Sequence, residues 1–69
     1  MRLSARNQIP GTIIAIDQGA VTTTVKVRLE GSTTMTSSIT KEAADDLGLE
    51  VGQAIIVVVK ASDVMIAVE

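Results

Sequence analysis

The 69-residue sequence predicts a mainly β fold, a five-stranded OB-like barrel with one short helix between the third and fourth strands. Two observations indicate this class. Runs rich in β-branched residues recur five times along the chain and are separated by short turn signals. The pattern is interrupted once, at residues 40–48, where the composition is that of a short helix. The resulting order, strand, strand, strand, helix, strand, strand, is typical of OB-like barrels.

The first three predicted strands are joined by two tight turns. Residues 11–17 are β-rich and end in the turn signal Asp17-Gln18-Gly19. Residues 21–30 alternate strictly, and Gly31-Ser32 is a hairpin signal that leads into a third strand at 33–39. One face of the second strand is expected to be shared by Val21, Thr23, Val25, Val27 and Leu29. These features predict a three-stranded antiparallel sheet.

The helix predicted at residues 40–48 has a start and a stop signal. Thr40 is a plausible N-cap, and Glu42 suits the positive end of the helix dipole. Gly48 stands where a left-handed residue commonly ends a helix. A narrow apolar face is expected from Ala43, Ala44 and Leu47.

The last two predicted strands, 53–60 and 63–68, are mostly apolar, and the first of them is apolar on both faces. A half-exposed antiparallel strand normally has one polar face, so this pattern indicates a subunit interface as well as a core. Residues 1–69 are expected to form one domain, which is short for a self-sufficient core. Because the chain has no cysteine and no histidine, it can have no disulfide and no metal site of thiolate or imidazole ligands. We therefore expect that assembly with other subunits supplies the missing stability.

Composition argues against several classes of partner. A net charge of −2 and the absence of Phe, Tyr and Trp disfavour a nucleic-acid binder. No signal-peptide pattern follows Met1, and the longest apolar run, residues 54–59, is far too short to cross a bilayer. We therefore expect a complete, cytoplasmic protein with no membrane or nucleic-acid partner.

Catalysis is not expected. A Ser–His pair is impossible without histidine, and no glycine-rich phosphate loop is present. A serine activated by lysine, Ser62 with Lys60, remains conceivable, but no oxyanion-hole motif accompanies it. The carboxylates lie in predicted turns or on the helix surface. The sequence thus predicts a protein that is not an enzyme.

An anion site is the more specific interpretation. Arg6 provides a planar set of donors suited to oxyanions, and Ser4 adds a hydroxyl. In an extended segment Lys60 and Ser62 would point the same way. Two positive charges and several N–H and O–H donors suit a tetrahedral dianion, if folding or assembly brings both ends of the chain together.

Each of these residues also has an ordinary interpretation. Arg6 could pair with Asp17 or Glu69 on the surface, and Lys60 and Ser62 could end a strand and form a turn. Thr40 is first of all an N-cap. Composition and spacing leave both interpretations open.

Several short motifs resemble the molbindin, or Mop, family of small barrel domains that bind molybdate and tungstate. The resemblance runs from Leu3 to Ala67, and it is the pairing of an N-terminal SARNQ with a C-terminal K-x-S-D-V-M-I that makes it specific. The motifs are SARNQ at 4–8, Gly11, TSSIT at 36–40, LGL at 47–49, GQ at 52–53 and VVKASDVMI at 58–66.

The resemblance implies an OB-type barrel with strand exchange between subunits, and a homo-hexamer built as a trimer of dimers. It implies that molybdate or tungstate is bound as an oxyanion between subunits, for intracellular molybdenum storage. Ser4 and Arg6 would line one side of the pocket, with Lys60, the backbone of Ala61, and Ser62 on the other. The segment that also approaches the anion would be Ser38, Ile39 and Thr40.

The chain departs from the family pattern in two places. Family members often carry basic residues on both sides of the glycine, whereas this chain has Ile9-Pro10-Gly11-Thr12, and Ser38 stands where an aliphatic residue is common. A second class of anion site that used those basic residues would be weak or absent.

Two rival functions remain: a molybdate-sensing regulatory module of a transporter or transcription regulator, and a binder of another tetrahedral oxyanion such as sulfate or phosphate.

Overall fold

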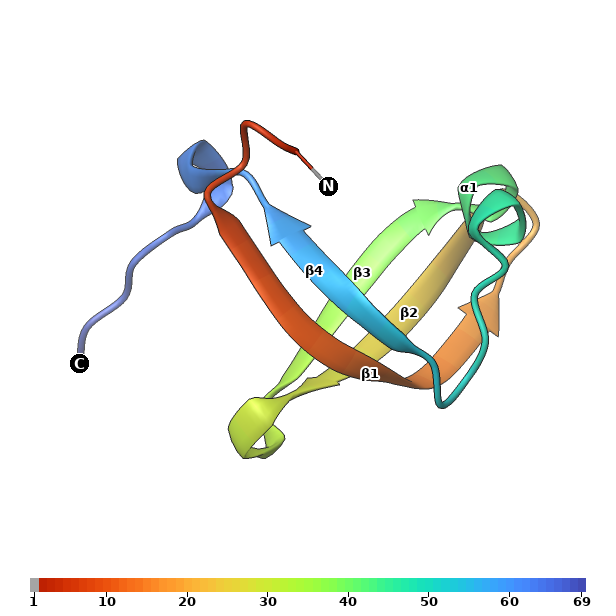
Figure 1. Cartoon of the computed structure of the whole chain (residues 1–69), viewed down its shortest axis with the longest axis horizontal. Coiled ribbons are helices and arrows are strands. Elements are labelled where there is room, and N and C mark those ends of the chain that lie inside the picture. Colours follow the sequence, from red (N-terminus) through yellow and green to blue (C-terminus); the bar gives the residue numbers. More distant parts are fainter. Residues whose placement is uncertain (1) are drawn as a thin grey trace.

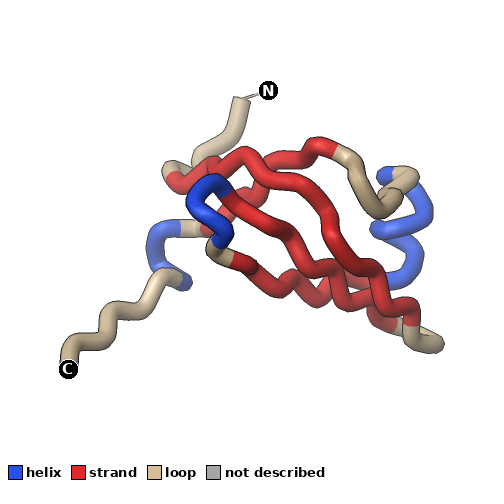
Figure 2. Tube along the Cα trace, turned by 90° about the horizontal axis from the view of Figure 1, so that it is seen from below, coloured by secondary structure: helices blue, strands red, loops and turns tan. Residues whose placement is uncertain are grey.

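The computed structural model describes residues 2–69, which form one curled antiparallel sheet with a short helix at one end (Figure 1). The strand order is β3-β2-β1-β4. Seen from below, the strands bend together into an open half-barrel (Figure 2). The elements are β1 (Asn7–Gln18), β2 (Thr22–Leu29), the 3-10 turn η1 (Glu30–Ser32), β3 (Thr34–Thr40), α1 (Lys41–Leu47), β4 (Ala54–Val59) and the 3-10 turn η2 (Ala61–Asp63).

Strand β1 begins four residues earlier than predicted and connects both arms of the sheet. Its first half pairs with β4, from Asn7 to Thr12, and its second half pairs with β2, from Gly11 to Gln18. A register shift between Ile13 and Ala15 lets the strand bend. Pro10 and Gly11 resemble strand breakers in the sequence, but both lie within β1.

Gly11 is required by a close approach of strands. A Cβ atom at this position would lie 2.5 Å from Val27 Cγ1 and 2.9 Å from the carbonyl oxygen of Arg28. Any other residue would therefore push β1 away from β2 near the point where β1 bends.

The core lies inside the curl of the sheet. Its fully buried members are Ile13, Val25 and Val27. Side chains packed against them include Ile16, Leu29, Ile39, Leu49, Ile55 and Val57. The alternation predicted for β2 is confirmed at Thr23, Val25 and Val27, which are buried. Val21 is 73% exposed because it precedes the strand, so the strand does not place it on their buried face as the alternation had predicted.

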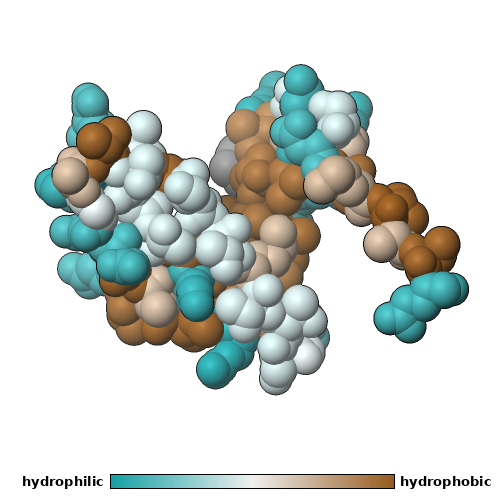
Figure 3. Space-filling model, turned by 180° about the vertical axis from the view of Figure 1, so that it is seen from behind, coloured by the Kyte–Doolittle hydropathy of each residue, from teal (hydrophilic) through white to brown (hydrophobic). Residues whose placement is uncertain are grey.

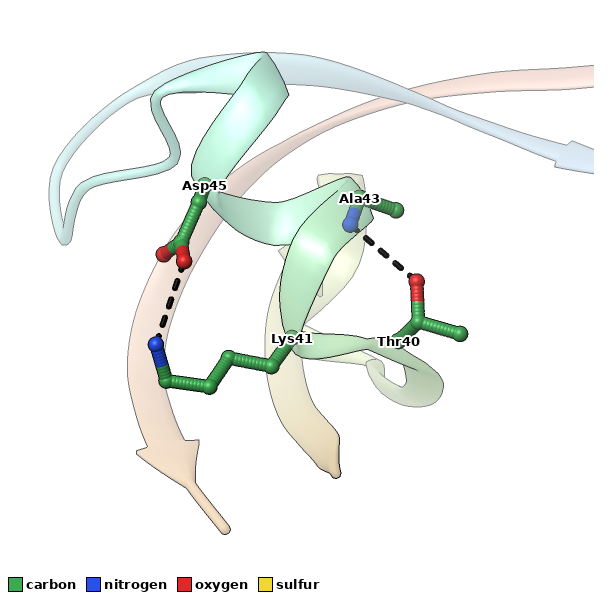
Figure 4. A network of polar contacts seen from close by, with 4 residues as sticks. All are labelled: Thr40, Lys41, Ala43 and Asp45. Atoms are coloured by element: carbon green, nitrogen blue, oxygen red, sulfur yellow. Dashed lines mark hydrogen bonds and ion pairs between the residues drawn. The ribbon is translucent and has the colours of Figure 1, made fainter. Parts of the chain in front are cut away.

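Helix α1 has the predicted end signals. Thr40 Oγ1 accepts a hydrogen bond from the N–H of Ala43 at 3.1 Å (Figure 4). At the other end, Gly48 adopts the left-handed conformation with φ 62°. Lys41 Nζ lies 3.2 Å from Asp45 Oδ2, one turn along the helix surface. Ala44 is buried, but Leu47 is 66% exposed, so the predicted apolar face is only partly covered.

The prediction of a fifth strand at residues 63–68 is wrong for a single chain. Ala61–Asp63 forms η2 instead, and residues 64–69 belong to no strand. This tail projects away from the body as a mostly apolar segment (Figures 1 and 3). A strand needs an edge to pair with, and η2 turns the chain away from both free edges, those of β3 and β4. Residues 2–69 thus form an open four-stranded half-barrel instead of a closed barrel.

No helix within residues 2–69 is long and apolar enough to span a bilayer.

Candidate anion site

The segment before β1 and the segment after β4 leave the sheet at the same end. Asn7 and Val59 are paired in the β1–β4 ladder, so Arg6 and Lys60 are the next residues on the two adjacent strands. Figure 1 shows the N-terminal segment and η2 close together at this end of the sheet. The fold therefore brings the segment containing Ser4 and Arg6 to the segment 60–62 within a single chain.

The segment 60–62 is a turn, so the prediction that alternation aligns Lys60 with Ser62 is wrong in its premise. The N–H of Asp63 donates to the carbonyl of Lys60 at 2.9 Å, and the N–H of Val64 donates to the carbonyl of Ala61 at 3.2 Å. The N–H groups of Ala61 and Ser62 precede these bonds and, within the described chain, have no acceptor. Unbonded N–H groups in the first turn of a helical segment are a usual source of anion contacts.

Arg6 and Lys60 are exposed and take part in no ion pair within residues 2–69, where the one salt bridge joins Lys41 and Asp45. The alternative in which Arg6 pairs with Asp17 or Glu69 is therefore not observed. Two like charges at one end of a sheet repel each other, and an anion between them removes that repulsion.

Ser38, Ile39 and Thr40 lie far from this end in the same chain. Ser38 pairs with Thr24, and Thr24 pairs with Asp17 near the opposite end of β1. Thr40 already serves as the helix N-cap through its Oγ1. The eight predicted site residues thus fall into two groups, and one chain assembles only the first. That group contains Ser4, Arg6, Lys60, Ala61 and Ser62.

A groove of about 190 Å³ opens between the free edges of β3 and β4. Figure 3 shows the surface hollowed between the two halves of the molecule, with apolar residues in the hollow. The lining is apolar apart from Ser37 and is formed by Ile13, Val25, Ile39, Leu47, Leu49 and residues 55–58. The prediction did not include this groove, although the segment predicted at 53–60, apolar on both faces, had indicated an interface on this strand.

The chain exposes more surface than a compact monomer of its size. Its accessible area is 5487 Å², and its mass is 7.2 kDa. A compact monomer of that mass exposes about 4,100 Å². The difference exceeds the roughly 800 Å² that one partner contributes to an ordinary protein–protein interface. The open edges and the extended tail account for this excess.

Comparison with known proteins places the whole chain in one family. Residues 3–66 match the TOBE domain family. The chain is 36% identical to a probable molybdenum-pterin-binding protein of Haemophilus influenzae, and the match covers all of both chains. It is 48% identical over 67 residues to the molybdenum transport protein ModE of Herbaspirillum seropedicae. That match covers 97% of this chain and a quarter of the longer relative.

Solved structures show the same fold. MopII of Clostridium pasteurianum superimposes with a TM-score of 0.92 at 36% identity, over 97% of this chain and all of that one. The cytoplasmic molybdate-binding protein ModG, solved with molybdate bound, gives a TM-score of 0.90 at 48% identity, over 94% of this chain and 46% of that one. The protein therefore belongs to the TOBE domain family and, within it, to the molbindins.

Proposed function

We propose that this protein binds molybdate as an intact oxyanion, at the contact between two copies of the chain, and stores it in the cytoplasm. One observation carries the proposal most directly. Arg6, Lys60 and the N–H groups of Ala61 and Ser62 gather at one end of the sheet without partners within residues 2–69. The relatives and structures named for molybdenum or molybdate support the choice of anion.

One half of the proposed site comes from each of two chains. Ser4 and Arg6, with Lys60, Ala61 and Ser62, form the cationic half at the β1–β4 end. The segment Ser38–Thr40 of a second copy would supply the other half, because in one chain it lies at the opposite end of β1. Seven of the eight residues are exposed and Ile39 is half-buried, so a second copy can still cover them.

Assembly by strand exchange would complete the fold. In this proposal the tail 64–68 of one chain enters the groove between β3 and β4 of another and closes a five-stranded OB-like barrel. Ile56 of β4 is 49% exposed and Val58 is 43% exposed, and both also line this groove. We propose that the resulting dimers associate further into a hexamer, a trimer of dimers.

The chemistry needed is recognition without catalysis. Hydrogen bonds that involve a charged partner contribute roughly 1.5–3 kcal/mol each, so a few suffice for firm binding after ordering costs. Within residues 2–69 no cluster of acidic side chains could hold a metal ion, and the chain has no cysteine or histidine. The ligand that we propose is the intact oxyanion, held by hydrogen bonds and charge. Tungstate has the same charge and shape as molybdate and should bind as well.

The proposal is tested by isothermal titration calorimetry with molybdate, tungstate and sulfate, together with native mass spectrometry. We expect heat from molybdate and tungstate, weak competition by the smaller sulfate, and bound anions on an oligomer. Absence of both heat and retained molybdenum at high micromolar concentration would overturn the proposal. Equal affinity for sulfate and molybdate would favour a binder of tetrahedral oxyanions in general.

A sensing module is the second candidate, because the chain is 48% identical to a quarter of a ModE protein. Intact-mass measurement of the protein purified from its native cells separates the two functions. A mass near 7.2 kDa favours storage, whereas a much larger chain carrying further domains favours sensing.

A further inference from the structure

We infer that the bound anion controls how the tail 64–68 docks on a second copy, so that anion binding and assembly reinforce each other. This coupling rests on the proposed function and concerns the regulation of the same site. The structural basis is that one short turn, η2, carries the anion donors and also sets the direction of the tail.

The coupling passes through Ala61. Its N–H has no acceptor within residues 2–69 and is offered to the anion, while its carbonyl accepts the N–H of Val64 at 3.2 Å. Val64 is the first residue of the tail. An anion that holds the N–H groups of Ala61 and Ser62 therefore restricts the rotation of the turn from which the tail leaves.

The tail has little else to orient it. Met65 is 92% exposed, Ile66 is 87% exposed and Val68 is 92% exposed, so beyond Val64 the tail barely touches its own chain. Docking must therefore restrict backbone torsions that are free before docking, which opposes assembly. A turn already held by an anion leaves fewer torsions to restrict, and this lowers the entropic barrier to docking.

The groove suits a tail presented in this way. An extended 64–68 segment places Val64, Ile66 and Val68 on one face, and the groove beside β4 is lined by apolar side chains. The free edges of β3 and β4 offer unpaired backbone groups on both sides. The five residues of the tail are one fewer than the six of β4, so an extended tail would pair along most of that strand. The tail of the same chain points away, so the occupant is a second copy (Figure 1).

Coupling between two binding events is reciprocal. If molybdate strengthens docking by some factor, docking strengthens molybdate binding by the same factor. A variant that damages only the tail should therefore weaken molybdate binding, although its cationic half-site is intact.

Subunit exchange measures this coupling even when the assembly is too tight to dissociate by dilution. Unlabelled and ¹⁵N-labelled oligomers are combined, and the formation of oligomers that contain both kinds of subunit is followed by native mass spectrometry. The measurement is made with no anion, with a saturating concentration of molybdate, and with the same concentration of sulfate. We expect molybdate to slow the exchange at least tenfold and sulfate to slow it far less. In Lys60→Ala, exchange should no longer respond to molybdate.

Ile66→Asp and Val51→Asp form a matched pair for the reverse direction. Both positions are exposed and apolar, at 87% and 63%, but only Ile66 lies in the tail. Ile66→Asp should speed exchange and weaken molybdate binding at least tenfold, while Val51→Asp should leave both unchanged. Circular dichroism checks that each variant keeps its sheet.

Two results would overturn the inference in distinguishable ways. If calorimetry shows molybdate binding but exchange rates agree with and without it, the coupling is wrong and the proposed function stands. If calorimetry shows no binding at all, both proposals fail.

Discussion

The two ends of β1 differ in how far one chain completes them. At the Gln18 end, α1 covers the sheet, Thr40 caps the helix, and Thr23 and Ala44 are buried. At the Asn7 end, Arg6 and Lys60 lie exposed beside a turn with unbonded N–H groups, and an apolar tail leaves the body. The first end folds by itself, whereas the second offers charge and apolar surface to something outside the chain.

The difference separates folding from function. Residues that are buried or capped in one chain determine its stability, and in our proposal the residues left exposed at the Asn7 end determine what it binds. Substitutions at the two kinds of position should therefore affect different measurements.

The largest effect on stability is expected in the core beside the bend of β1. Ile13 is 1% exposed, so Ile13→Ala removes buried methyl and methylene groups and leaves a cavity. The free energy of unfolding should fall by about 2–5 kcal/mol, as measured by urea denaturation at fixed protein concentration. Val51→Ala, at a position that is 63% exposed, is the control and should change it by less than about 0.5 kcal/mol. Similar losses for both would contradict this description of the core.

At the Asn7 end, Lys60→Ala should change binding but not folding. Loss of one charge-assisted contact should weaken molybdate binding by about 2 kcal/mol or more, which is roughly 30-fold. Lys26→Ala removes another exposed lysine, from the outer face of β2, and should leave the affinity unchanged. Calorimetry measures both variants. An unaltered affinity in Lys60→Ala would place the anion elsewhere.

The helix cap gives a smaller effect at the Gln18 end. Thr40→Ala removes the hydrogen bond that Oγ1 accepts from the N–H of Ala43, and should lower the free energy of unfolding by about 1 kcal/mol. Thr36→Ala, at an exposed position of β3, is the matched control. If Thr40 also contacts the anion, the same variant will weaken molybdate binding, and Thr36→Ala will not.

The smallest effect concerns Thr23, whose Oγ1 is buried without a hydrogen-bond partner within the described residues. Thr23→Val keeps the shape of the side chain and removes the unpaired hydroxyl. We expect thermal unfolding to show no loss, and a gain of up to about 1 kcal/mol. Thr23→Ala, which leaves a void, should be destabilising. A clear loss of stability in Thr23→Val would mean that the hydroxyl has a partner.

Local signals predicted local structure well. Three predictions are confirmed: the alternation of β2, the N-cap at Thr40 and the left-handed Gly48. Each of these features depends on residues that are close together in the sequence. The early start of β1 was missed. Residues 7–10, which include Pro10, belong to the strand because they pair with β4, and that pairing joins residues far apart in the chain.

The candidate site was predicted in part. The residue types for an oxyanion could be recognised in the sequence, and family resemblance selected the positions. The sequence could not show that segment 60–62 forms a turn with unbonded N–H groups, or that Ser38–Thr40 lies at the other end of the sheet. Those facts depend on long-range pairing.

By itself the sequence determined the β-rich class, the position of the helix and the absence of cysteine and histidine chemistry, because composition and short-range periodicity are enough for these. Tertiary structure alone decided that Arg6 and Lys60 flank the paired residues Asn7 and Val59, and that the last apolar segment stays outside its own half-barrel. Both outcomes follow from strand register and the direction of one turn. Neither can be obtained from neighbouring residues, because strand pairing joins residues that are far apart in the chain.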